Sequence, residues 1–289
     1  MDKKNIRALI HLLDDPDTEV SDLVTGNLKE LGTEIIPELE LAWEKSPDQY
    51  SQEKIENIIQ DIQFRNIKKN LLSWKYSGAS DLLNGVCWIT RYQYPDLENQ
   101  EIEKAIDRIS GDIWLELNNK LTALERVRII NHIMFDVHKF SRNSRNIYSP
   151  RNSYINQVLE SKKGNPVSLA IIYILVAEKL DLPIYGVSLP KIFILAYMDK
   201  PAAYIKQTSG KKVMFYINPY NRGAVLGKKE IDHYLLQQKL EPQESFYIPC
   251  SNQEIAQRLL QSLILSYQKS GLPEKIKDLQ ELLNIVKPY

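Results

Sequence analysis

Cysteine, histidine and aspartate side chains can together build a nucleophilic active site, and one part of this sequence offers all three types. Only two cysteines occur, and Cys87 is followed downstream by His132, Asp136 and His138. A thiol with an ordinary pKa of about 8.5 becomes nucleophilic when a helix N-terminus or a neighbouring imidazolium favours the thiolate. Cys87, however, lies in a helical pattern of apolar neighbours, and free cysteine is among the most buried residue types. The sequence therefore favours an inert core thiol here.

The residue spacing predicts neither a metal site nor a phosphate-binding site. His132 and His138 are six residues apart, which does not place them on one helix face as a four-residue step would. No cluster of Cys and His has the spacing of a zinc site, and neither common glycine-rich phosphate loop occurs. We therefore expect no metal and no cofactor.

A basic run with interleaved tyrosines could bind an acidic partner or RNA. It consists of Arg142, Arg145, Tyr148, Arg151, Tyr154, Lys162 and Lys163. Such a run is more often a solvated face, and the chain balances 37 Lys and Arg against 37 Asp and Glu. We therefore expect no nucleic-acid partner.

The composition is that of a globular protein with a sizeable core. Of the 289 residues, 43% are hydrophobic and 26% are charged. The first residues are polar and lack the apolar run of a signal peptide, and the most apolar window, 167–177, is too short to cross a membrane. Both cysteines stand in apolar or aromatic company, which fits a reducing compartment. We expect a cytoplasmic protein without membrane partners.

Helical patterns fill the N-terminal part of the chain. Apolar residues recur at helical spacing on both sides of an Asp-Asp-Pro-Asp turn at 14–17, and the second helix stops at Gly32. A third helix begins near Pro37. This arrangement resembles a HEAT repeat, and because one such unit cannot bury both of its faces, we expect it to pack on the next part of the chain.

The central part changes from helices to strands. After an amphipathic helix at 102–117 and a second one that opens with Thr122, the polar stretch 141–153 predicts a long loop. Asn165 followed by Pro166 predicts the N-cap and first turn of a core helix. Runs rich in β-branched and aromatic residues then predict strands, joined in part by a hairpin turn at Ser209-Gly210, over 184–189, 192–198 and 213–217.

Helices resume at Lys229 and continue to the end of the chain. Ser251 and Glu254 form a capping pair for the first of two final helices, which are separated by the turn 271–273. This pair resembles one tetratricopeptide-type hairpin.

The order of one core helix and three strands, with the motifs within it, resembles the transglutaminase-like core, and more closely the SirB-type branch of that superfamily. The resemblance runs from about Tyr94 to Gly227 and is carried by Asn152-Ser153-Tyr154-Ile155, Val158-Leu159-Glu160, Gly164-Asn165-Pro166-Val167-Ser168-Leu169-Ala170, Leu180-Asp181-Leu182-Pro183-Ile184-Tyr185-Gly186-Val187, Leu189-Pro190 with Phe193, and Ile217-Asn218-Pro219-Tyr220. It implies a bacterial protein with a papain-like fold, α+β and mostly α, in which a small antiparallel sheet is flanked by helical hairpins.

In active members of that superfamily, a Cys at the start of the core helix, a His on the following strand and an Asp on the next form a catalytic triad. Ala170 and Pro183 fix the register, so the resemblance places the Cys position at Pro166. The His and Asp positions are then Ile192 and Asn218. None of these three side chains can attack a carbonyl or shuttle a proton, and each suits its place in a helix, strand or turn. The resemblance therefore implies a protein that is not an enzyme.

The leading hypothesis is a non-catalytic, regulatory or binding module whose degenerate active-site cleft binds another protein or a peptide. The candidate cleft residues are Asn152, Asn165, Pro166, Ser168, Lys191, Ile192 and Asn218. The alternative is a residual amide hydrolase or acyl transferase that uses Ser168, with Lys191 as its base, or Cys87. The run Gly85-Val86-Cys87-Trp88 is similar to the Gly-x-Cys-Trp of animal transglutaminases. A third hypothesis is a purely structural role in a regulatory assembly.

The same resemblances suggest three domains. We expect a HEAT-like region at 1–92, a transglutaminase-like core at 93–228 and a helical region with a tetratricopeptide-like hairpin at 229–289.

Overall fold

The structure is a computed structural model that describes residues 3–46, 48–199 and 213–287. The chain divides into two compact units, of which the first comprises Met1–Ser73 and Arg91–Pro95 and the second Trp74–Thr90 and Asp96–Tyr289. The three domains expected from the sequence stay a prediction.

The first unit is helical and has its own core. Its elements are α1 (Lys3–His11), η1 (Leu12–Asp14), α2 (Thr18–Leu31), η2 (Gly32–Ile35), α3 (Ile36–Lys45) and the greater part of α4 (Gln49–Tyr76). Leu28 of α2 and Leu39 of α3 are fully buried, and α4 adds Ile55, Ile58 and Ile62 to the same cluster. The first three helices thus bury their apolar faces against α4.

The second unit contains the remaining helices. They are α5 (Leu82–Thr90), α6 (Asn99–Trp114), α7 (Ala123–Asn131), the π-helical turn η3 (His132–Val137), η4 (Pro150–Asn152), α8 (Ile155–Ser161), α9 (Pro166–Lys179), η6 (Pro219–Asn221), α10 (Lys228–Gln237), η7 (Glu244–Phe246), α11 (Asn252–Ser270) and α12 (Pro273–Val286). The predicted capping boxes begin α7 at Thr122 and α11 at Ser251, where each hydroxyl accepts from the backbone N–H three residues later.

The sheet of the second unit is antiparallel, in the order β3-β4-β5-β6. Its strands are β3 (Ile184–Leu189), β4 (Ile192–Met198), β5 (Val213–Asn218) and β6 (Ala224–Leu226). β3 and β4 have the predicted bounds, and β5 extends the predicted strand by one residue. The predicted hairpin turn at Ser209-Gly210 lies outside the described residues. The expected fold class, α+β and mostly helical with a small antiparallel sheet, is confirmed.

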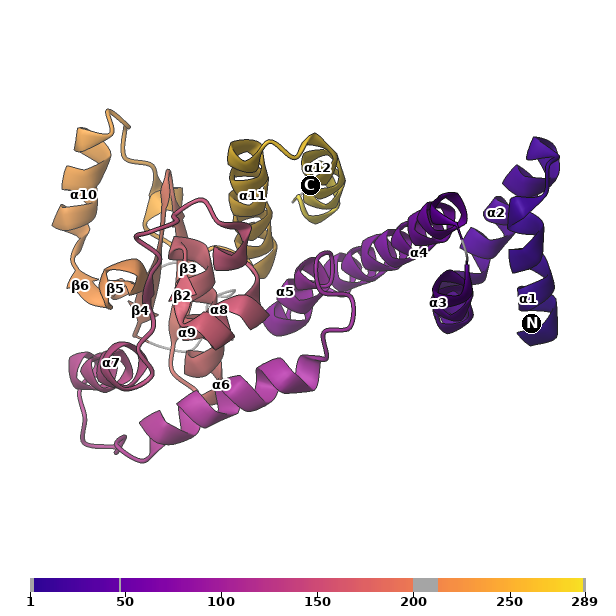
Figure 1. Cartoon of the computed structure of the whole chain (residues 1–289). Coiled ribbons are helices and arrows are strands. Elements are labelled where there is room, and N and C mark those ends of the chain that lie inside the picture. The colour runs from indigo at the N-terminus through magenta and orange to yellow at the C-terminus, as the bar shows by residue number, and fades with distance from the viewer. Residues whose placement is uncertain (1–2, 47, 200–212, 288–289) are drawn as a thin grey trace. The chain divides into compact units, whose positions relative to one another are not determined.

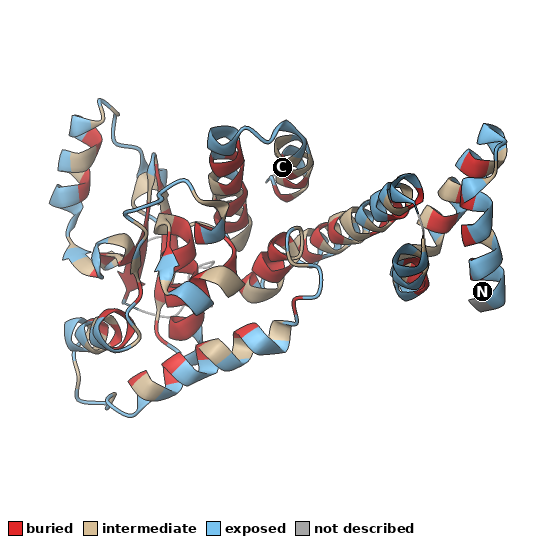
Figure 2. Cartoon of the chain, in the orientation of Figure 1, coloured by how far each residue is buried: buried red, intermediate tan, exposed pale blue. Residues whose placement is uncertain are grey.

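Helices cover both faces of this sheet. In Figure 1, α10 lies on one side of the strands, and α9 and α11 lie on the other. α9 is the core helix, and every residue from Val167 to Ala177 is buried, so its ribbon is almost entirely red in Figure 2. The most apolar window of the sequence, 167–177, thus forms the greater part of this buried helix. No helix among the described residues has the length and apolar character needed to cross a membrane.

The polar stretch 141–153 contains more structure than its sequence suggests. Its first two residues, Ser141–Arg142, form β1, which pairs in parallel with β2 (Lys163–Gly164), and η4 lies near its end. Asn152 and Ser153 are 3% and 1% exposed, although nothing in the sequence marked this loop as part of a core. The loop is therefore attached to the start of the core helix by hydrogen bonds rather than by apolar contacts.

Candidate functional site

The N-terminus of α9 is closed by its own side chains. The Asn165 side-chain oxygen accepts hydrogen bonds from the backbone N–H groups of Val167 and Ser168, each at 2.9 Å. The Ser168 hydroxyl accepts from the Asn165 N–H at 3.0 Å, and the Leu169 N–H donates to the Asn165 carbonyl. Pro166 has no N–H to donate. Each first-turn donor that could have stabilised a thiolate or an oxyanion already has an acceptor.

Further polar contacts, made by Asn152 and Ser153 at the end of the polar loop, hold this cap in place. The Ser168 hydroxyl donates to the Asn152 carbonyl at 2.6 Å, and the amide of the N-cap residue donates to Ser153 Oγ at 2.7 Å. The Asn152 side chain donates to the Asn146 carbonyl at 2.8 Å and accepts from Asn143 Nδ2 at 2.9 Å. Because these groups are buried and mutually satisfied, they fix the polar loop to the core helix. The structure thus brings Asn152, Asn165 and Ser168 together in one network.

Two of the other predicted cleft residues, Ile192 and Asn218, lie on the α10 face of the sheet. Side chains alternate along each strand, and the residues that pack against α10 include Ile194, Ala196 and Tyr216. Ile192 and Asn218 lie on the same face of the sheet, because each is an even number of positions from these residues along its strand. The intervening residues face α9, where burial and the nearby Tyr197 raise the pKa of Tyr173 well above its ordinary value. A side chain at 192 or 218 is therefore directed away from the face on which α9 packs.

Ile192 and Asn218 line one pocket between the sheet and α10. The pocket has a volume of about 260 Å³ and is lined by Leu189, Ile192, Ile194, Asn218, Leu226, Glu230, Ile231, His233, Tyr234 and Gln237. Its floor consists of apolar strand residues, and apart from Asn218 of β5 its polar side chains come from α10. His233 and Gln237 contact each other at 2.8 Å, and the Asn218 side chain accepts from the Asn221 N–H at 3.3 Å.

Lys191 lies beside this pocket, and its contacts differ from those of Ser168. It occupies the tight turn between β3 and β4 with φ of 65°, and its ammonium group donates to Gln238 Oε1 at 3.0 Å. The Ser168 hydroxyl donates instead to a backbone carbonyl. The serine and lysine of the predicted pair therefore have separate partners. The three positions at which the resemblance places the catalytic triad are also apart in the fold. Pro166 begins α9, whereas Ile192 and Asn218 lie under α10.

Cys87 is fully buried on α5, with 0% of its surface exposed. A Cβ on the neighbouring Gly85 would lie 2.6 Å from the Trp74 ring, so glycine is needed there for close packing of helix on indole. The run at 85–88 is thus explained by packing. Cys250 is partly buried, and its burial, followed by the nearby Glu254, raises the pKa of its thiol to about 12. Cys87 is therefore inaccessible, and the raised pKa of Cys250 is the opposite of the lowered pKa of a reactive cysteine.

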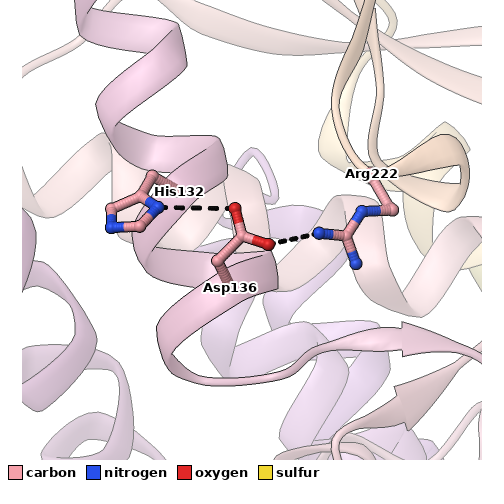
Figure 3. A network of polar contacts seen from close by, with 3 residues as sticks. All are labelled: His132, Asp136 and Arg222. Atoms are coloured by element: carbon pink, nitrogen blue, oxygen red, sulfur yellow. Dashed lines mark hydrogen bonds and ion pairs between the residues drawn. The ribbon is translucent and has the colours of Figure 1, made fainter.

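A polar network that the sequence only partly indicated holds the loop after Asn218. His132 and Asp136, one turn apart on the π-helical η3, contact each other at 3.4 Å, and Asp136 forms an ion pair with Arg222 (Figure 3). Burial raises the pKa of Asp136, but the His132 contact and the Arg222 charge lower it by more. The four-residue spacing of His132 and Asp136 could have predicted their contact, whereas nothing in the sequence pointed to Arg222. His138 has a separate partner, Asp112, at 2.8 Å.

The same loop is fixed by a second contact from α7. The Asn131 amide donates to the Gly223 carbonyl at 2.8 Å and its oxygen accepts from the Tyr173 hydroxyl at 3.1 Å. Gly223 has φ of 72°, and a Cβ there would lie 1.9 Å from Asn131 Oδ1. The loop that carries Asn218 is therefore held against the core helix through one asparagine.

A buried helix that precedes an antiparallel sheet, with a loop clamped at the end of β5, defines the class of the core. The family model described as the transglutaminase-like superfamily matches residues 100–261, which is more than half of the chain, and the chain belongs to that superfamily.

Three relatives show how far the similarity extends. A "UPF0162 protein" of Xylella fastidiosa is 31% identical over 150 residues, which are 52% of this chain and 50% of that protein. A "UPF0162 protein" of Vibrio cholerae is 25% identical over 209 residues, or 70% of this chain and 73% of the relative. F-box only protein 21 of Mus musculus is 26% identical over 156 residues, or 54% of this chain and 24% of the mouse protein. The chain thus spans about half the length of the Xylella relative and about a quarter of the mouse protein. No solved structure matches the chain.

Proposed function

We propose that this chain is a non-catalytic member of the transglutaminase-like superfamily, of its SirB-type branch, and that it binds a protein or a peptide. The residues at the start of α9 support the lack of catalytic activity. Pro166 occupies the position at which the resemblance places the nucleophilic cysteine, and the first-turn N–H groups donate to Asn165. The hydroxyl of Ser168 is buried and donates to a carbonyl, and the thiol of Cys87 is buried in α5. A nucleophile needs access to its substrate, and both groups are buried.

The proposed binding site is the pocket under α10. The observation that carries the proposal is that Ile192 and Asn218, the His and Asp positions of the register, both line it. An apolar floor with a few polar groups at its edge is the usual form of a site that accepts an apolar side chain and fixes its backbone by hydrogen bonds. Glu230, His233 and Gln237 supply that edge from successive turns of α10.

We expect the partner to be a peptide segment rather than a metabolite, because the pocket volume of about 260 Å³ is smaller than that of most small-molecule sites. The similarity to about a quarter of a much longer mouse protein supports a modular role, since there the matching part is one portion of a longer chain.

The test is selection from a random peptide display library against the purified full chain. Bound peptides are then measured by calorimetry against wild type, Ile192→Arg and Leu265→Arg. The first substitution fills the pocket with a charged side chain, and the second places the same side chain on an exposed face of α11, where Leu265 is 46% exposed. We expect Ile192→Arg to abolish binding and Leu265→Arg to preserve it. Peptides that bind both variants like wild type would exclude this pocket as the site.

A further inference from the structure

Lys162 differs from the rest of the basic run 142–163. Its four arginine and lysine companions are exposed, whereas Lys162 is partly buried. Its ammonium group lies 4.8 Å from the centroid of the fully buried Phe140 ring. Its main chain is also fixed, since its N–H donates to Val158 at 2.9 Å and its carbonyl accepts from Ser141 at 2.8 Å. The chain therefore holds this lysine in place instead of leaving it in solvent.

The lysine faces a second cation across a pocket. The pocket has a volume of about 370 Å³ and is lined by Ala105, Arg108, Ile109, Val137, His138 and Lys162. Partial burial of Lys162, and then the charge of the exposed Arg108, lower the pKa of Lys162, as expected when a like charge is close. Two cations brought together in this way repel each other unless an anion lies between them.

The described part of the chain does not supply that anion. Within residues 3–46, 48–199 and 213–287, neither Arg108 nor Lys162 forms an ion pair. Asp107, next to Arg108, pairs with Lys179 at 2.8 Å on another side of α6. Asp112, one turn further along, contacts His138 Nε2 at 2.8 Å. The uncompensated charge is that of the arginine and the lysine.

We propose that this pocket between α6, η3 and the end of α8 binds a phosphate monoester, with the dianion held between Arg108 and Lys162. Two cations match a dianion in charge, and a guanidinium group beside an ammonium group is a common pair for phosphate oxygens. Ile109 and Val137 form an apolar wall next to the cations, and the pocket is larger than the anion alone requires. The organic group of the ester lies against that wall. This site is separate from the pocket under α10 and does not depend on the function proposed for it.

The test is calorimetric titration of the full chain, in a low-salt buffer free of phosphate, with phenyl phosphate and with inorganic phosphate. The variants are Arg108→Gln and Lys162→Gln, and the matched control is Lys104→Gln, an exposed lysine one turn earlier on α6 that does not line the pocket. Thermal unfolding of each variant verifies that it is folded.

Saturable binding of phenyl phosphate by wild type is expected, weakened at least about tenfold by either pocket variant, which is the loss typical for one hydrogen bond to a charged group. Lys104→Gln should bind within about twofold of wild type. Tighter binding of phenyl phosphate than of inorganic phosphate supports an ester ligand seated on the apolar wall. Equal binding supports the anion site but overturns the assignment of the ester group. No saturable binding by folded wild type, or equal losses in all three variants, overturns the proposal.

Discussion

Gly223 is the residue whose replacement should have the largest local effect. Gly223→Ala would place a Cβ 1.9 Å from Asn131 Oδ1 at a φ of 72°. The backbone strain and the displaced asparagine, which also accepts from Tyr173, should lower the free energy of unfolding by about 2–4 kcal/mol. Chemical denaturation measures this difference.

Gly111→Ala is the matched control for that experiment. Gly111 lies inside α6 in the same unit, and a Cβ there meets nothing within 4 Å. Alanine in a helix interior is favoured over glycine by about 0.5–1 kcal/mol, so this variant should be slightly more stable than wild type. Two glycine substitutions with equal effects would contradict the clamp at Gly223.

The two thiols should be unreactive in the folded protein. Cys87 is fully buried, and the pKa of Cys250 is raised to about 12. At pH 8 the thiolate fraction of Cys250 is then about three orders of magnitude below that of an ordinary cysteine. Site-resolved alkylation with iodoacetamide from pH 5 to 9 should modify Cys87 only on unfolding and Cys250 very slowly. Rapid alkylation of Cys87 near neutral pH would favour the alternative function, a cysteine-dependent acyl transferase or amide hydrolase.

At the scale of single elements, the cap of α9 should contribute more to stability than an exposed cap. Asn165→Ala removes the side-chain acceptor of two backbone N–H groups and a hydrogen bond to Ser153, all partly buried. The expected loss is about 2 kcal/mol, against about 1 kcal/mol or less for Thr122→Ala at the exposed cap of α7. Asn165→Asp keeps the cap acceptor and should recover most of the loss. Urea denaturation of the three variants measures these values, and a larger loss at Thr122 would contradict the argument.

The elements were predicted best where local signals were strong. Asn165 and Pro166 mark the start of α9 because a side-chain cap and a first-turn proline act locally. The same holds for the capping box at Ser251 and for the β-branched strands β3 and β4. The π-helical turn η3 left no such signal, since its residues would suit an ordinary helix equally well.

The site was harder to predict because it depends on which face of the sheet a residue occupies. The alternation of Ile192 and Asn218 along their strands can be read from the sequence, but the helix that covers each face cannot. Only the packing of Ile231 and Leu235 of α10 against Ile194 decides it. The contact of Arg222 with Asp136 joins residues 86 positions apart and likewise has no local signature.

At the scale of the whole molecule, one carboxyl should make stability depend on pH near neutrality. Burial, and then the charge of Asp81, raise the pKa of Glu178 from 4.5 to about 7. The fold thus favours the protonated form, so this contribution is fully present below pH 4.5 and is lost as the pH rises to about 7. Glu178 is nevertheless exposed by its accessible surface area, so solvent screening reduces the size of the effect.

The measurement is the melting temperature of wild type and Glu178→Gln between pH 4.5 and 8. Wild type should lose more stability over this range than the variant, because glutamine cannot ionise. Glu160→Gln, at an exposed position on α8, should follow wild type. Asp81, Glu103 and Lys179 line the same pocket and stay unchanged in both variants. Parallel curves for wild type and Glu178→Gln would exclude Glu178 as the source of the pH dependence.

The closed cap of α9 also bears on evolution. A cysteine restored at position 166 would find the first-turn donors bound to Asn165, and a histidine restored at 192 would lie on the α10 face of the sheet. Under the proposed register and non-catalytic function, a single substitution would therefore confer no partial activity on which selection could act. A lineage with this arrangement would have to change the cap, the strand and the loop together to gain the catalytic triad.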